Sequence, residues 1–271
     1  MASPGRVRPA LSLPGDGTLL GVSTLVFTIA LAGTIAGSTS MSAMGEMTMP
    51  GGWTMSTIWM RMPGESWVAA CAAFAGMWAV MMVAMMLPSL MTMLRRYRRA
   101  VARGSVERLG ELTVAVAAGY FAVWIWLGLA VFPIGAGLAA VVMRRPEVAE
   151  AVPLLAGAVV ALAGVLQFTR FKARHLVCCR EAQGRDHPQH PSGRGAWRHG
   201  VGLGLHCARC CAGFMAILLA MGVMDLRAMA AVAAAITIER VAPEGVGARR
   251  AIGGVAVGAG LLLVGRAAGL G

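Results

Sequence analysis

The chain has 271 residues, of which 58% are hydrophobic and only 13% are charged. About a quarter of the residues of an ordinary soluble domain are charged, so this composition excludes a soluble globular protein and indicates one that lies in a lipid bilayer. The net charge of +12 does not indicate nucleic-acid binding, because the basic residues cluster between apolar segments, where they usually set membrane topology.

Apolar segments along the chain predict an all-α fold, a polytopic transmembrane helical bundle that forms a single membrane domain over residues 1–271. A helix that crosses a bilayer needs about 20 mainly apolar residues. Such segments lie at residues 18–37, 67–91, 111–142, 151–169, 202–224, 228–239 and 250–268. We expect seven spans, or six if the short alanine-rich segment 228–239 does not cross, and a tilt or break at Pro133 in the third.

Basic residues in two loops predict how the bundle is oriented. Six arginines lie within residues 95–108, and seven basic residues lie within residues 170–198. Arginine and lysine concentrate in cytoplasmic loops. The loops 95–110 and 170–200 are therefore predicted to lie inside, together with the N-terminus, and the loop 38–66 outside the plasma (inner) membrane.

Methionine is unusually frequent, with 20 copies, and several of them lie in the predicted outer loop 38–66. Thioether sulfur is a soft ligand that suits Cu(I). The alternative is that these methionines fill gaps where the loop lies on the membrane interface or covers the helices. The sequence leaves both interpretations open.

A second group of methionines lies in the segment 67–91. Met81 and Met85 are four residues apart, as are Met82 and Met86, so each pair lies along one face of a helix. Such a stripe is either core packing or a path for a soft ion. Its spacing resembles that of the methionine rings in Ctr-type copper importers; a ring would require several copies of the chain, so a homo-oligomer is among the expected assemblies.

Three cysteines lie together at the start of the segment 202–224. Cys207, Cys210 and Cys211 have the i, i+3, i+4 spacing of one helix face, and Met215 extends that face by one turn. The predicted orientation places them at the cytoplasmic end of the membrane, where thiols stay reduced. Two or three convergent thiolates would suit Cu(I), and four would suit zinc.

Further ligands could come from nearby in the sequence. Cys178 and Cys179 are candidates if the loop 170–200 folds back, and we expect one of the two to bind the ion; His206 adds an imidazole next to Cys207. A competing interpretation is a thiol–disulfide pair, because Cys207 and Cys210 have the two-residue separation of redox motifs.

Several motifs occur in a fixed order: "MWAVMMVAMMLPS" (77–89), Lys172 followed by "CCR" (178–180), "CARCC" (207–211), "GVMDL" (222–226) and "ER" (239–240). Together they resemble the bacterial "predicted metal-binding integral membrane protein" family, a domain of unknown function, over about residues 67–245. The chain departs from it at Asp225 and Arg240, where family members often have Asn and Lys. The resemblance implies metal binding without naming the metal.

These features predict a membrane protein that binds a soft metal ion, Cu(I) above all, for copper transport or delivery. Outer methionines would capture the ion, the methionine stripe would line its path, and the cysteines would receive it. The expected partners are a metallochaperone or a membrane metalloenzyme. A phosphate loop is absent from the sequence, so any transport would be passive or coupled to a gradient. The alternatives are a membrane thiol–disulfide oxidoreductase and a non-catalytic accessory subunit of a membrane metalloenzyme.

Overall fold

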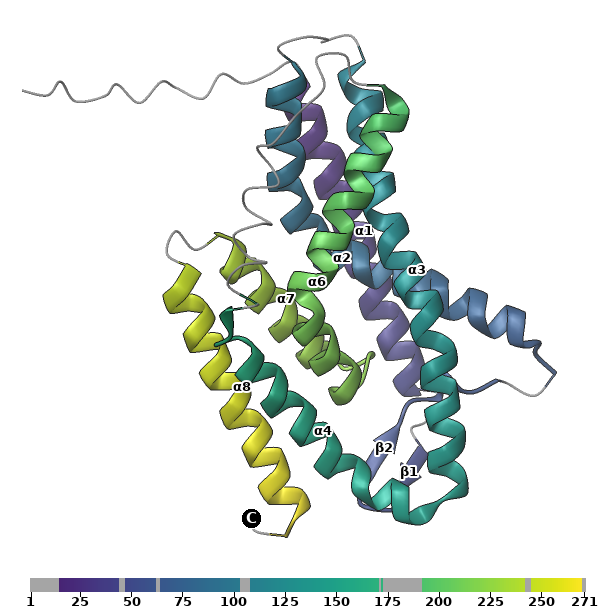
Figure 1. Ribbon diagram of the computed structural model, residues 1–271. Coiled ribbons are helices and arrows are strands. Elements are labelled where there is room, and N and C mark those ends of the chain that lie inside the picture. Colours follow the sequence, from purple (N-terminus) through teal and green to yellow (C-terminus); the bar gives the residue numbers. More distant parts are fainter. Residues whose placement is uncertain are drawn as a thin grey trace, which may run out of the picture.

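The computed structural model describes residues 15–43, 47–61, 64–102, 108–170, 172, 192–241 and 245–269. Helices dominate this part of the chain: α1 (Asp16–Ala43), α2 (Trp67–Val101), α3 (Leu109–Arg144), α4 (Pro146–Leu166), α6 (Gly193–Met221), α7 (Leu226–Val241) and α8 (Gly245–Ala267) (Figure 1). Between α1 and α2 lie two short strands, β1 (Met47–Met49) and β2 (Trp53–Met55), and a 3-10 helix, η1 (Thr57–Trp59). The predicted all-helical fold is confirmed.

Six of these helices are long and apolar enough to cross a membrane, and α7 is not among them. With 16 residues, α7 is the short helix that the sequence analysis treated as the uncertain span. Many large apolar side chains on the outer faces of the bundle are exposed, among them Leu25, Val255 and Leu262. Such a surface is stable in lipid and costly in water, so the chain is a multi-pass membrane protein.

The helices differ from the predicted spans at an expected break and at two boundaries. α3 continues through Pro133 without a break. α2 extends to Val101, so the first seven residues of the predicted basic loop 95–110 are helical. Ser192 caps α6 well before residue 202 by accepting a hydrogen bond from the Gly195 amide at 3.1 Å. Hydropathy marks only the apolar part of a helix, whereas the hydrogen-bonded helix runs on into polar sequence.

The closest helix pairs are held together by glycine. A Cβ atom at Gly200 of α6 would lie 2.1 Å from the Val116 carbonyl oxygen of α3, and one at Gly119 of α3 would lie 2.4 Å from the Trp197 carbonyl oxygen of α6. Small residues allow this approach of two backbones, which is how helices associate in lipid. The contact fixes Tyr120, the next residue of α3, against the middle of α6.

A second glycine contact joins α4 to α8. A Cβ atom at Gly164 would lie 2.6 Å from the Val257 amide nitrogen, and one at Gly260 would lie 2.4 Å from the Ala161 amide nitrogen. The short helix α7 contacts α2, α6 and α8, and it follows α6 after a turn at Gly222, whose φ of +111° suits glycine (Figure 1). α7 thereby returns along α6 and brings its last turn back to the cysteines.

The predicted outer loop 38–66 is largely structured. β1 and β2 form an antiparallel hairpin in which Met47 pairs with Met55. Met49 and Met55 are buried against the ends of α3 and α4, and the Trp53 indole donates a hydrogen bond to the Ala149 carbonyl oxygen at 2.8 Å. Packing therefore accounts for these two methionines, while Met47 remains 41% exposed.

Candidate metal-binding site

Cys207 and Cys211 of α6 form a buried pair of thiols. Their side chains are 0% and 2% exposed, and the two Sγ atoms lie 4.0 Å apart. They lie one helical turn apart on the same face. The sequence had suggested that the cysteines lie at the start of their helix. Because α6 begins at Gly193, the pair instead lies near its middle.

The separation of the two sulfurs suits a shared metal ion. With metal–sulfur bonds of about 2.3 Å, sulfurs 4.0 Å apart subtend an angle of about 120° at the ion. Cys210 is buried beside them, 3% exposed. Among the residues that the structure describes, no group of three or more His, Cys, Asp or Glu side chains is arranged to hold a metal ion.

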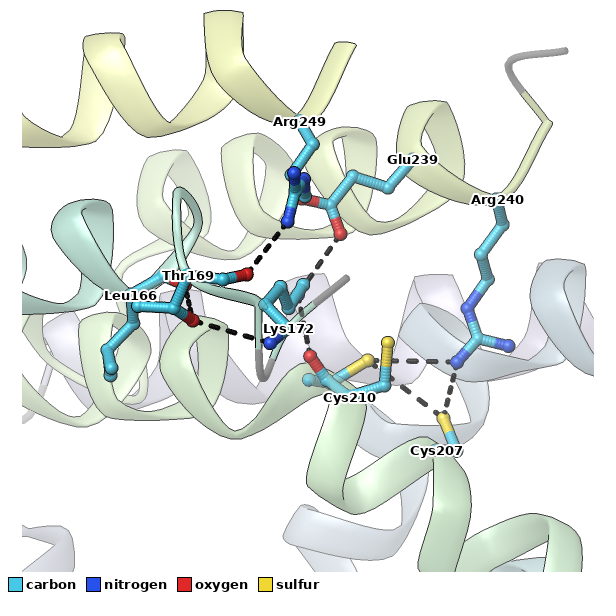
Figure 2. A network of polar contacts seen from close by, with 9 residues as sticks. Leu166, Thr169, Lys172, Cys207, Cys210, Glu239, Arg240 and Arg249 are labelled. Carbon is cyan, nitrogen blue, oxygen red and sulfur yellow. Dashed lines mark hydrogen bonds and ion pairs between the residues drawn. The ribbon is translucent and has the colours of Figure 1, made fainter. Parts of the chain in front are cut away.

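Two hydrogen-bond donors converge on the sulfur of Cys207. The Tyr120 hydroxyl donates to it at 2.9 Å. Arg240 Nη2, from the last turn of α7, donates to it at 2.8 Å (Figure 2). The same nitrogen lies 3.7 Å from the Cys211 sulfur. Two donors, one of them a permanently charged guanidinium, thus lie against this sulfur and could stabilise negative charge on it. Metals bind cysteine as the thiolate.

A buried ion pair lies next to the thiols. Lys172 Nζ lies 3.1 Å from Glu239 Oε2, donates to the Cys210 carbonyl oxygen at 2.6 Å, and lies 4.5 Å from the centre of the Phe214 ring (Figure 2). Glu239 therefore pairs with Lys172, whereas its neighbour in sequence, Arg240, contacts the thiols. Burial raises the pKa of Glu239, and the Lys172 ammonium opposes that shift.

The methionine stripe belongs to the same core as the thiols. Met81, Met82, Met85 and Met86 are each at most 5% exposed and share one cluster of buried residues with Cys207, Cys211 and Met215. Trp78, one turn before Met81, donates from its indole nitrogen to the Trp124 carbonyl oxygen at 2.8 Å. The predicted sulfur residues of α2 and α6 therefore meet in one buried region.

The remaining predicted ligands, Cys178 and Cys179, lie outside the described residues. Conversely, Tyr120 and Arg240 were not predicted from the sequence to be part of the site. Their signal was a phenol and a guanidinium in or beside apolar segments, where polar groups are rare and usually functional. The sequence alone did not indicate which cysteine they would contact.

Residues 75–263 match the model of a family described as PpoB2, copper chaperone. The match covers most of the chain and includes the methionine stripe, the three cysteines of α6, Lys172, Glu239 and Arg240. No curated protein and no solved structure matches the chain. The match confirms the resemblance to a metal-binding membrane family and identifies the metal as copper.

Proposed function

Since the chain belongs to the PpoB2 copper chaperone family, we propose that it holds Cu(I) between the thiolates of Cys207 and Cys211 within the membrane and delivers it to a partner. Membership in a family of copper chaperones implies copper binding and partners for delivery. The choice of Cu(I), the ligands and the path of the ion are our own proposal.

The observation that carries the proposal is the buried thiol pair itself. The two sulfurs lie 4.0 Å apart, and one guanidinium nitrogen contacts both of them. Soft thiolate ligands select Cu(I), whereas structural zinc requires four ligands in a tetrahedron. A two-sulfur site, with Cys210 as an adjacent third sulfur, therefore favours Cu(I) over zinc.

The methionines would supply the path. Met81, Met85, Met82 and Met86 lie in the same buried cluster as the thiols, and Met215 lies one turn beyond Cys211. Thioethers bind Cu(I) reversibly and thiolates bind it more strongly, so ligand strength would rise toward Cys207 and Cys211. We propose that the ion passes in this direction, from the outer side of a plasma membrane inward, with the N-terminus in the cytoplasm.

Delivery requires a second protein. A soluble metallochaperone or a membrane metalloenzyme would take the ion from the thiols, and Cys178 and Cys179 lie close in sequence to Lys172, which contacts α6. A thiol–disulfide exchange function is less well supported, because the thiols that lie together are Cys207 and Cys211, not the Cys207–Cys210 pair of the redox spacing, and both are buried from a partner thiol.

The test is copper loading of the full-length protein, purified in detergent under reducing, oxygen-free conditions. Wild type should bind one Cu(I) per chain against a chromogenic Cu(I) chelator, with sulfur as the neighbouring atom in X-ray absorption. The double variant Cys207→Ser, Cys211→Ser should lose this ion, because hydroxyl oxygen is a hard, poor ligand for Cu(I). Cys71→Ser is the matched control, since Cys71 is a partly buried thiol on α2 that should not matter. Undiminished copper stoichiometry in the double variant would refute the proposal.

A further inference from the structure

The Arg240 guanidinium occupies an unusual position for a residue beside a metal-binding thiol pair. One of its nitrogens, Nη2, donates to Cys207 at 2.8 Å and lies 3.7 Å from Cys211, so a single positive group contacts both sulfurs (Figure 2). Arg240 is partly buried at the end of α7, and the two thiols are buried. A fixed cation therefore lies against the site that would receive another cation.

The charges around the thiols favour an ion of low charge. With Cys210 counted as a neutral thiol, the two thiolates carry −2, and Arg240 reduces this to −1, because a guanidinium keeps its proton at all relevant pH values. The neighbouring Lys172 and Glu239 form an ion pair and cancel. A monovalent ion would make the centre neutral, whereas a divalent ion would leave an excess positive charge in a region of low dielectric constant, where charge is costly.

Arg249 does not change this order. It donates to the Thr169 carbonyl oxygen at 3.0 Å, near Glu239. If the positive charge of Arg249 is counted, the net charge of the site rises by one whichever ion is bound. Binding a divalent ion therefore still leaves more positive charge than binding a monovalent ion. The guanidinium of Arg240 also covers the side of the sulfur pair that faces α7, and so opposes the approach of the additional ligands that zinc and cadmium require.

We propose that Arg240 is a specificity-determining residue: it makes the Cys207–Cys211 pair selective for monovalent soft ions over divalent thiol-binding ions. The inference rests on the proposed function, in which these two thiolates hold the metal. It goes further by assigning the selection against Zn(II) and similar ions to the fixed charge on α7. Tyr120, which also donates to Cys207, adds a hydrogen bond but no charge, and so serves as the matched comparison.

The experiment measures a ratio of affinities in the full-length purified protein. Ag(I) is the monovalent probe and Cd(II) the divalent probe, because both bind thiolates well and differ in charge. In Arg240→Gln the preference for Ag(I) over Cd(II) should fall at least tenfold. In Arg240→Lys, which keeps the charge, it should stay within about threefold of wild type. In Tyr120→Phe both ions should bind more weakly by a similar factor, of about fivefold for one lost hydrogen bond, with the ratio unchanged.

A measurement on wild type alone keeps the inference testable if Arg240→Gln does not fold. Wild type should discriminate against Cd(II) at least tenfold more strongly than a small free dithiol, which has two sulfurs and no guanidinium; equal discrimination would overturn the role of Arg240. An unchanged ratio in a folded Arg240→Gln would also overturn it. The proposed function is tested separately: if the Cys207→Ser, Cys211→Ser variant still binds Ag(I) as wild type does, the thiol pair is not the site. If that variant loses Ag(I) while Arg240→Gln keeps the wild-type ratio, only the selectivity inference fails.

Discussion

Replacing Gly200 by alanine should separate α3 from α6 and disturb the thiol site at a distance. The new Cβ atom would lie 2.1 Å from the Val116 carbonyl oxygen, whereas ordinary contact begins at 3.4 Å, so the helices must move apart locally by about 1.3 Å. If Tyr120 moves with α3, its distance to the Cys207 sulfur increases from 2.9 Å to about 4.2 Å, and the hydrogen bond is lost. The obstacle is backbone, so we expect an overpacking cost near the upper end of the usual range, about 3 kcal/mol, offset by about 0.5–1 kcal/mol of helix propensity gained on replacing glycine.

The matched control is Gly202→Ala on the same helix. A Cβ atom there meets nothing within 4 Å, so this variant should be as stable as wild type or slightly more stable. Thermal unfolding in detergent, followed by tryptophan fluorescence, should show a clearly lower midpoint for Gly200→Ala and an unchanged or higher one for Gly202→Ala. Copper loading should weaken in the first variant alone. Equal stability of the two variants would refute the close α3–α6 packing on which the placement of Tyr120 depends.

Three further predictions concern the core, the ion pair and the topology. Changing Met81 and Met85 together to leucine should cost under about 1.5 kcal/mol each and leave the protein purifiable, yet lower copper uptake into cells; normal uptake would assign the two residues to packing alone. Lys172→Met should destabilise the protein by about 3–5 kcal/mol, because it removes the ion-pair partner of the buried Glu239 carboxylate, and adding Glu239→Gln should restore part of the stability in thermal unfolding; no recovery in the double variant would contradict the coupling. A membrane-impermeant label should reach a tag inserted within 38–66 from outside the cell and should not reach one between α2 and α3, and the reverse pattern would invert the proposed orientation.

The sequence predicted the helices well because lipid imposes a simple requirement on composition. A helix that crosses a bilayer must be apolar over most of its length, and the predicted span 111–142 corresponds to α3, which runs from Leu109 to Arg144. The hairpin between α1 and α2 was not predicted, because strands of three residues are too short for a recognisable alternation. The helical spacing of the cysteines correctly placed Cys207 and Cys211 on one buried face.

The groups that surround the thiols could not be predicted in the same way, because their contacts are set by tertiary structure. Tyr120 is 87 positions from Cys207, and Arg240 is 33 positions from it. The first contact depends on the glycine packing of α3 against α6, and the second on the turn at Gly222 that sends α7 back along α6. Hydropathy and motif spacing describe single segments and carry no information on how two segments meet.

Burial of the thiol pair also determines how quickly an ion could be exchanged. With Cys207 and Cys211 at 0% and 2% exposure and Arg240 of α7 lying against them, a partner's ligand approaching from the side of α7 would reach the sulfurs only when α7 moves away from α6. The residence time of a bound ion would then follow the frequency of that movement, in the microsecond-to-second range of helix and domain motions, and not the strength of the metal–sulfur bonds. A partner that displaces this 16-residue helix on docking would accelerate transfer without weakening the equilibrium affinity of the closed site.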